Sequence, residues 1–250
     1  MSHKKTINVA LIGNPNTGKT SLFNELTGLN QKVGNYPGVT VDKKEGSSKL
    51  QKNLKAIITD LPGTYSINPT SLDESIVLKT LLNSKSEKKS DVIVVVADIE
   101  NLKRNLLLFS QIKDLEIPTV LAINMADQME RKGITLDIKL LEKELGNDVV
   151  LLSVRKEKGI DELKKAIVNT YHSAKAFPLC NVNNRIDPAY FDRLKEINPN
   201  YSIYELWLMI THNSFPDTIS REEKSALLNF KNDSKNLKKY QHKETIFRYQ

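Results

Sequence analysis

Residues 13–20 read Gly13-Asn14-Pro15-Asn16-Thr17-Gly18-Lys19-Thr20. They match the pattern G-x-x-x-x-G-K-[ST], in which backbone N–H groups surround a phosphate, the lysine reaches the β- and γ-phosphate oxygens, and the last hydroxyl binds Mg²⁺. A strand-like apolar run, 7–12, precedes the pattern, and a helix-like run that begins at Ser21 follows it. Because the helix N-terminus then points at the anion, this context favours a phosphate-binding loop over a chance glycine-rich turn.

Two further motifs are expected to sense the γ-phosphate and the metal. Asp60-Leu61-Pro62-Gly63 follows the apolar run 56–59, so Asp60 can hold Mg²⁺ through a water and the Gly63 N–H can meet a γ-phosphate. Gly38-Val39-Thr40 lies between this motif and the phosphate loop. Thr40 can there add a second hydroxyl to the metal when a γ-phosphate is present. The sequence therefore predicts an Mg²⁺ site made by Thr20, Thr40 and Asp60.

The base is expected to be guanine because of two motifs farther along the chain. Asn124-Met125-Ala126-Asp127 follows the apolar run 118–123, and the Asp127 carboxylate can accept hydrogen bonds from guanine N1–H and the 2-amino group. Adenine lacks that pair of donors, so it would leave a buried acceptor unpaired. The backbone of Ser153-Val154-Arg155 could contact guanine O6. Each motif is common by chance, but all of them in this order predict a guanine-nucleotide site. The expected nucleotide contacts are Gly13, Asn14, Pro15, Asn16, Thr17, Gly18, Lys19, Thr20, Ser21, Gly38, Val39, Thr40, Asp60, Gly63, Asn124, Met125, Asp127, Ser153, Val154 and Arg155.

The reaction that these motifs predict is GTP hydrolysis by in-line attack of water on the γ-phosphorus. Lys19, the N–H groups of the phosphate loop and Mg²⁺ would stabilise the developing negative charge, and Thr40 and Gly63 would act in the same step. Thr64 follows Gly63, at the position where Ras-type enzymes carry a glutamine that orients the attacking water. The intrinsic turnover is therefore expected to be slow. A nucleotide-dependent interaction module with negligible hydrolysis is an alternative.

The composition of the chain limits the classes of protein to which it can belong. The chain has 250 residues, a net charge of +7, and 39% hydrophobic and 27% charged residues, which fits a soluble globular protein. Its longest clean apolar run, 92–97, is far shorter than the roughly 20 residues of a membrane helix. Cys180 is the single cysteine, so no disulfide can form within the chain. Lysines are mixed with acidic residues, which favours a solvated surface over a nucleic-acid footprint. The tail after Lys231 is more one-sidedly basic and could lie near anionic lipid.

Strand-like and helix-like runs alternate through about residue 172. Strands are expected at 7–12, 46–50, 54–59, 92–97, 119–123 and 149–152, and helices at 18–27, 72–83, 101–114, 135–145 and 160–173. Ser71 and Glu74 form a capping-box pattern at the start of the second helix. This alternation predicts an α/β fold, a Ras-like P-loop GTPase domain over 1–174 with a mainly parallel six-stranded sheet covered by helices on both faces.

The chain changes character after His172, because no further strand-like run follows. Trp207 lies in an apolar run and is expected in a core. Helix starts are predicted at Asp187 before Pro188 and at the capping boxes Ser202/Glu205 and Ser220/Glu223. The sequence therefore predicts a small all-helical domain over 178–250.

Taken together, these motifs resemble one known family, the bacterial ferrous-iron transporters FeoB. The resemblance rests on residues 13–28, on Gln31-Lys32-Val33-Gly34-Asn35-Tyr36-Pro37-Gly38-Val39-Thr40-Val41, on Asp60-Leu61-Pro62-Gly63-Thr64-Tyr65-Ser66 and on Asn101-Leu102-Lys103-Arg104-Asn105-Leu106. It is dense over 7–173 and extends to the helical part by position and helical character. Met125, where many GTPases have lysine, is common in FeoB-like sequences and agrees with the family.

In that family the helical part is a guanine-nucleotide dissociation inhibitor domain, and a membrane-spanning domain follows it. The resemblance implies the regulatory module of a ferrous-iron transporter at the cytoplasmic face of the inner membrane, with this fragment itself soluble and cut before the membrane domain. The implied partners are GTP, GDP and the membrane-spanning part, without nucleic acid. Self-association into a homo-oligomer is left open.

The resemblance also bears on Asn16. FeoB and related potassium-activated GTPases carry an asparagine at this loop position, where it helps to hold K⁺ beside the phosphates. Asn16 is either such a ligand or a plain turn residue. A different hypothesis for the whole chain is a free-standing Era-like GTPase that acts on RNA or ribosomes, although 178–250 carries no recognisable RNA-binding signature.

Overall fold

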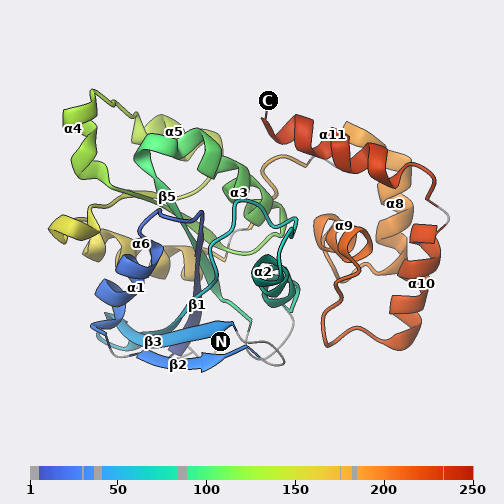
Figure 1. The fold of residues 1–250 in the computed structure, drawn as a ribbon, viewed down its shortest axis with the longest axis horizontal. Coiled ribbons are helices and arrows are strands. Elements are labelled where there is room, and N and C mark those ends of the chain that lie inside the picture. Colours follow the sequence, from blue (N-terminus) through green and yellow to red (C-terminus); the bar gives the residue numbers. More distant parts are fainter. Residues whose placement is uncertain are drawn as a thin grey trace.

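A seven-stranded sheet forms the centre of the computed structural model, which describes residues 6–29, 31–36, 41–83, 89–174, 176–181, 185–232 and 234–249 (Figure 1). The strand order is β2-β3-β4-β1-β5-β6-β7. β4, β1, β5, β6 and β7 are parallel, whereas β3 runs antiparallel to both β2 and β4. The strands are β1 (Thr6–Gly13), β2 (Gln31–Asn35), β3 (Asp42–Gln51), β4 (Leu54–Asp60), β5 (Val92–Asp98), β6 (Thr119–Asn124) and β7 (Val149–Leu151). The carboxyl ends of the parallel strands therefore share one edge, as the motifs require.

Helices cover both faces of the sheet because the central strands are apolar on both sides. Successive side chains of a strand point to opposite faces. In β1, Val9 and Leu11 belong to the core that also contains residues of α1 and α6, whereas Ala10 and Ile12 belong to the core shared with α2 and α3. The helices of this part are α1 (Lys19–Thr27), α2 (Leu72–Leu82), α3 (Leu102–Asp114), α4 (Met129–Lys132), α5 (Ile138–Leu145) and α6 (Ile160–Ser173).

The described residues beyond α6 contain helices and no strand, as predicted. These helices include α8 (Pro188–Ile197), α9 (Ile203–His212), α10 (Arg221–Asn232) and α11 (Leu237–Tyr249). They lie beside α2 and α3 (Figure 1). The predicted caps are confirmed: Asp187 caps α8 with proline following it, and Ser202 and Glu205 form a complete capping box on α9. Trp207 is 1% exposed and is in edge-to-face contact with Phe191. The prediction that it lies in a core is therefore confirmed.

The prediction of a six-stranded sheet was wrong by one strand. Residues 31–35 form β2, and β3 begins at Asp42 rather than at residue 46. All five side chains of β2 are exposed, so no apolar alternation marks the strand in the sequence. The strand forms because its backbone pairs with β3, from Gln31 opposite Gly46 to Asn35 opposite Asp42.

Two local predictions also need correction. The helix expected at 135–145 begins at Ile138, because the Asp137 carboxylate accepts the Leu140 N–H and caps the helix there. The capping box at Ser71 is only half formed: the Ser71 hydroxyl accepts the Glu74 N–H at 3.3 Å. The Glu74 carboxylate instead accepts from the Thr70 N–H at 2.8 Å and from the Thr64 hydroxyl at 2.9 Å. Glu74 thus holds the segment that follows Gly63.

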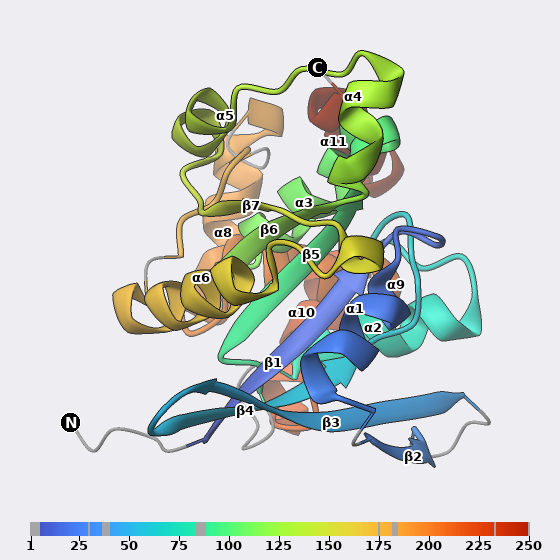
Figure 2. The same ribbon diagram turned by 90° about the vertical axis from the view of Figure 1, so that its left-hand side faces the viewer.

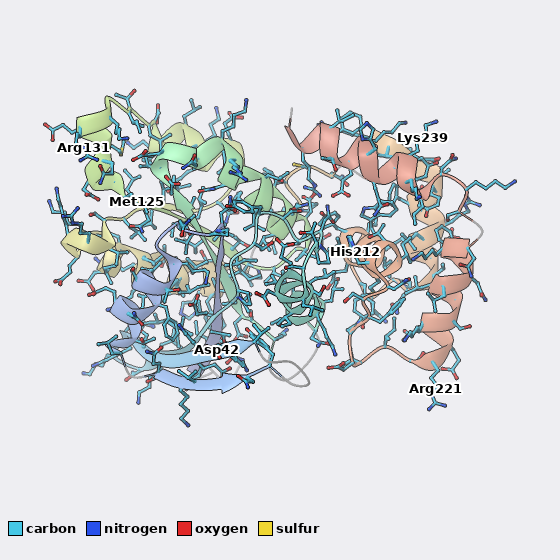
Figure 3. The ribbon with its side chains drawn as sticks, in the orientation of Figure 1. Asp42, Met125, Arg131, His212, Arg221 and Lys239 are labelled. Atoms are coloured by element: carbon cyan, nitrogen blue, oxygen red, sulfur yellow. The ribbon has the colours of Figure 1, made fainter. Side chains whose placement is uncertain are left out.

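Among the described residues, contacts between the helical part and the rest of the chain differ in character. At α2 the contacts are polar and mostly exposed, with Asn83 and Asp217 exchanging hydrogen bonds of 2.8 and 3.2 Å. His212, at the end of α9 facing α2 (Figure 3), lies 2.9 Å from Asn68 Oδ1. At α3 the contact is buried, because Arg248 of α11 pairs with Asp114 at 2.8 Å. None of the helices in the described ranges combines the length and apolarity needed to cross a bilayer.

Candidate nucleotide site

The phosphate-binding pattern occupies the turn between β1 and α1. β1 ends at Gly13 and α1 begins at Lys19, with Gly18 as its N-cap in the left-handed conformation (φ 81°). A Cβ on Gly13 would lie 2.4 Å from the Val96 carbonyl oxygen of β5, and one on Gly18 would lie 2.3 Å from Asn124 Nδ2. Both glycines are therefore required by close packing, and the free N–H groups at the start of α1 face the carboxyl edge of the sheet.

Asp60 comes together with two residues of the phosphate loop. Lys19 and Asp60 form a buried ion pair, with side chains 9% and 6% exposed. The Thr20 hydroxyl donates to the other Asp60 oxygen at 3.1 Å. A hydroxyl and a carboxylate thus converge beside a phosphate loop, and such hard oxygen donors are the ligands that Mg²⁺ prefers. Thr20 and Asp60 fit the predicted metal, whereas Gly38, Val39 and Thr40 lie outside the described residues.

The segment after Asp60 packs directly on the phosphate loop. The Thr64 N–H donates to the Gly13 carbonyl at 3.1 Å, and a Cβ on Gly63 would lie 3.4 Å from atoms of Pro15. The Thr64 side chain is 1% exposed and its hydroxyl donates to Glu74. Thr64 is therefore held inside the protein, so its hydroxyl is not offered to the phosphate side.

The predicted base motifs form one hydrogen-bonded cluster with the phosphate loop. Asn124 is 4% exposed. Its Nδ2 donates to the Thr17 carbonyl at 3.0 Å, and its Oδ1 accepts the Val154 N–H at 3.2 Å. The amide of Asn124 thus ties three segments together that are far apart in the chain.

Asp127 stands at the rim of this cluster. The Ser153 hydroxyl donates to Asp127 Oδ1 at 2.7 Å, and this hydrogen bond is the main cause that lowers the pKa of Asp127 below its usual value. The carboxylate is therefore ionised at neutral pH and acts only as an acceptor. Met125 (Figure 3), which lies between β6 and the short 3₁₀ turn Ala126–Gln128, has a φ of 63°, in the left-handed region.

A cavity of about 820 Å³ opens beside this cluster. This size suits a nucleotide-sized ligand. Several of the residues around it are not among the nucleotide contacts predicted from the sequence, because they lie outside the nucleotide-binding motifs. The lining consists of Gly18, Ser21, Asn24, Glu25, Gly28, Leu29, Asn124, Met125, Asp127, Gln128, Val154 and Arg155. The missed ones, Asn24, Glu25, Gly28, Leu29 and Gln128, come from the C-terminal half of α1, the turn after it and the turn after Asp127.

The two asparagines of the phosphate loop differ in their surroundings. Asn16 has a φ of 67° and an exposed side chain, so its carboxamide is open to a ligand. Asn14 is 3% exposed, and neither its Nδ2 nor its Oδ1 has a hydrogen-bond partner. Most buried polar side-chain atoms in folded proteins are hydrogen-bonded, so the Asn14 amide is an exception within the phosphate loop.

Gly18→Ala is expected to weaken GDP binding at least tenfold, a change of about 1.4 kcal/mol. The new methyl group would displace Asn124, and alanine would be strained at a φ of +81°. Gly133→Ala is the matched control, because Gly133 also has a positive φ of +63° but nothing lies within 4 Å of the position that its new methyl group would take. Calorimetric titration of both variants with GDP checks this, and equal affinities would contradict it.

Comparison with known proteins agrees with this geometry. The family model described as ferrous iron transport protein B matches residues 7–167. The Fe(2+) transporter FeoB of Leptospira biflexa is 48% identical over 160 residues, which are 64% of this chain and 23% of that protein. That of Escherichia coli K12 is 43% identical over 167 residues, 65% of this chain and 21% of that protein. The chain thus spans less than a quarter of the length of these relatives.

Solved structures extend the similarity to the helical part. A mutant of S. thermophilus NFeoB bound to GDP is 33% identical, with a TM-score of 0.77 over 97% of this chain and 96% of that chain. The cytosolic domain of L. pneumophila FeoB is 34% identical, with a TM-score of 0.77 over 97% of this chain and 94% of that one. The α/β part has the Ras-like fold of the FeoB G domains, as the sequence predicted. The chain therefore belongs to the FeoB family of ferrous-iron transporters, of which it carries the N-terminal G-domain region.

Proposed function

We propose that this chain binds GDP and GTP and hydrolyses GTP slowly, as the regulatory G-domain region of a membrane ferrous-iron transporter. The observation that carries the proposal is the Asn124 amide, which bonds to both the phosphate loop and the 153–155 loop and so holds Asp127 at the end of the cavity. GDP in the S. thermophilus structure supports the same ligand here. The transporter relatives favour this function over that of an Era-like RNA-associated GTPase.

The residues of the site suit phosphoryl transfer to water. Lys19 is placed to neutralise the β- and γ-phosphate oxygens once it exchanges its Asp60 partner for a phosphate, and the N–H groups that lead into α1 add a preorganised positive field. Thr20 and Asp60 would hold Mg²⁺, which when bound neutralises charge on the phosphate oxygens. Thr40 is proposed to complete that shell and Gly63 to contact the γ-phosphate.

Slow turnover follows from the position of Thr64. Its hydroxyl is engaged by Glu74 inside the protein, so this side chain cannot orient the attacking water as the glutamine of Ras-type enzymes does. Hydrolysis then depends on charge stabilisation by Lys19 and the loop N–H groups, which leaves a large part of the barrier in place.

We assign the G domain to 1–174 and a regulatory helical domain to 178–250. The helical domain contacts Asn68, in the segment that follows Gly63, through His212, and burial lowers the pKa of this histidine, so that it is neutral at pH 7. A contact to this segment gives the helical domain a means to restrain GDP release. The membrane-spanning part of the transporter is the proposed partner of the whole region.

Calorimetry with GDP and ADP tests the function directly. GDP is expected to bind at least a hundredfold more tightly than ADP in the presence of Mg²⁺, because only guanine offers two donors to Asp127. GTP should be converted to GDP at a rate well below that of an enzyme with an arginine finger. Equal affinity for the two diphosphates would reject the proposed function.

GTP hydrolysis is expected to be faster in KCl than in NaCl at equal ionic strength. K⁺ held by the exposed Asn16 carboxamide would place positive charge beside oxygens that become more negative in the transition state. An arginine finger in this role gives about 10³–10⁵ in rate, and a monovalent ion should give much less, roughly tenfold or more. Asn16→Ala should remove the difference and leave GDP affinity nearly intact, whereas Asn200→Ala, at an exposed asparagine of the helical part, should retain it. Equal rates of the unmodified protein in the two salts would reject the potassium role.

A further inference from the structure

One face of α11 is basic and exposed. Residues three or four positions apart in a helix lie on the same side, and five exposed residues follow that spacing along α11 and the turn before it. This basic face consists of Lys235, Lys238, Lys239, His242 and Ile246. Lys239 lies at the outer edge of the molecule (Figure 3). Glu244, the single acidic residue of α11, is 2% exposed, so no carboxylate of the helix itself offsets these cations.

The opposite side of α11 is fixed to the protein. The Tyr240 hydroxyl donates to the carboxylate that caps α8. Glu244 accepts from Trp207 Nε1 at 2.8 Å, and Arg248 pairs with Asp114 of α3. Tyr240, Glu244 and Arg248 are four positions apart, and they hold the helix along most of its length. The basic face therefore has one orientation, and a partner would not have to order the helix on binding.

The lysines of the basic face are not used in the folding contacts of the protein. Lys231, at the end of α10, shows the contrast, because its Nζ donates to Asn213 at 2.7 Å. Within the described ranges, Lys235, Lys238 and Lys239 form no ion pair. Their charges are therefore available to an anionic partner.

A cavity beside the basic face offers a place for an anionic group. Lys235 and the exposed Arg193 of α8 line this cavity of about 360 Å³. The Asp187 carboxylate also lines it, but both of its oxygens already accept hydrogen bonds, one from the Tyr240 hydroxyl and one from the Tyr190 N–H at 3.1 Å. Two cations thus face the cavity against one carboxylate that is already satisfied, which suits a phosphate group.

We propose that the basic face of α11 docks on the surface of a bilayer that contains anionic lipids, with Lys235 and Arg193 beside a lipid phosphate. The relatives of this chain are ferrous-iron transporters, and a transporter has to sit in a membrane. Anionic lipids attract clustered lysines and arginines, and an exposed aliphatic side chain such as Ile246 adds apolar contact at the interface. A surface for single-stranded nucleic acid would instead carry aromatic side chains on which bases stack. The docking does not depend on the proposed GTP binding, because no residue that lines the nucleotide cavity comes from the helical part.

Co-sedimentation with lipid vesicles tests this docking. The chain is expected to bind vesicles of phosphatidylcholine mixed with phosphatidylglycerol, but not vesicles of phosphatidylcholine alone, and the binding should weaken as the salt concentration rises. Each lysine near an anionic surface contributes about fivefold to binding, so Lys238→Gln combined with Lys239→Gln should weaken it roughly twentyfold. The matched control is Lys52→Gln combined with Lys55→Gln, which changes the net charge equally at two exposed lysines of the β3–β4 hairpin. Because β3 lies at the opposite end of the molecule from α11 (Figure 2), the control should weaken binding less than about twofold.

Two further variants separate a bilayer from other anionic partners. Arg193→Gln should weaken vesicle binding about fivefold, as expected for one cation beside a lipid phosphate. Ile246→Ser should weaken vesicle binding and leave binding to a single-stranded RNA unchanged, because only the bilayer offers an apolar contact. Melting temperatures verify that each variant is folded. Equal binding to the two kinds of vesicle, equal losses for the two lysine pairs, or tighter binding to the RNA than to the anionic vesicles would overturn the proposal.

Discussion

Asp127→Ala is expected to weaken GDP binding more than a hundredfold and to leave ADP binding nearly unchanged. The ionised carboxylate can accept from guanine N1–H and from the 2-amino group, and hydrogen bonds to a charged group are worth about 1.5–3 kcal/mol each. Losing both costs about 3 kcal/mol or more. The Ser153 hydroxyl already orients the Asp127 carboxylate by a hydrogen bond of 2.7 Å. Little of the binding free energy is therefore spent on fixing that side chain when guanine binds. Titration calorimetry with GDP and ADP gives both constants.

A nucleotide with a different base, xanthosine diphosphate in place of GDP, provides the matched test for Asp127. Asp127→Asn should bind GDP poorly, because the amide NH₂ of asparagine is a hydrogen-bond donor and would face the donors of guanine, N1–H and the 2-amino group. Xanthosine diphosphate carries a carbonyl in place of the 2-amino group, so the same variant should bind it better than GDP. Glu130→Ala, at an exposed carboxylate on the neighbouring α4, is the control and should keep the preference for GDP. If Asp127→Ala retained that preference, the base would have to be recognised elsewhere in the cavity.

Arg248→Met is expected to lower the melting temperature by several degrees, from a loss of about 3–5 kcal/mol. The side chain is 1% exposed and bonds to Asp114 at 2.8 Å and to Glu244 at 2.9 Å. Its guanidinium lies 4.5 Å from the ring centre of Tyr204. Methionine fills similar space but leaves two buried carboxylates without their cation. Thermal unfolding followed by circular dichroism measures the change.

Controls separate the charge effect from packing at this contact. Lys239→Met, on the exposed surface of the same helix (Figure 3), should change the melting temperature little. Adding Asp114→Asn to Arg248→Met should recover part of the loss, because it removes one unpaired charge. If the helical domain restrains GDP release, the Arg248 variant should also release a fluorescent GDP faster. A melting temperature unchanged by Arg248→Met would mean that the pair does not hold α11 to α3.

The sequence alone was sufficient for the motifs whose chemistry is local. A phosphate loop needs glycines, a lysine and a hydroxyl within eight positions, and strand and helix signals next to it fix its orientation. The same holds for the helix starts at Asp187 and Ser202, because a cap involves residues only three positions apart. These short-range constraints made the α/β fold and the helical region predictable.

The tertiary structure decided what depends on residues far apart. β2 has no apolar pattern and exists through its pairing with β3. The Asn124 amide can bond to Thr17 and Val154 because the carboxyl ends of the parallel strands lie at one edge of the sheet. The ion pair between Arg248 and Asp114 joins residues 134 positions apart in the chain. In the sequence Tyr36 is one aromatic residue in a polar loop, yet its ring is buried and its hydroxyl has no hydrogen-bond partner among the described residues, because of its neighbours on β1, β3 and β4. Local patterns are set by backbone geometry over a few residues, whereas these contacts follow from which faces the completed fold brings together.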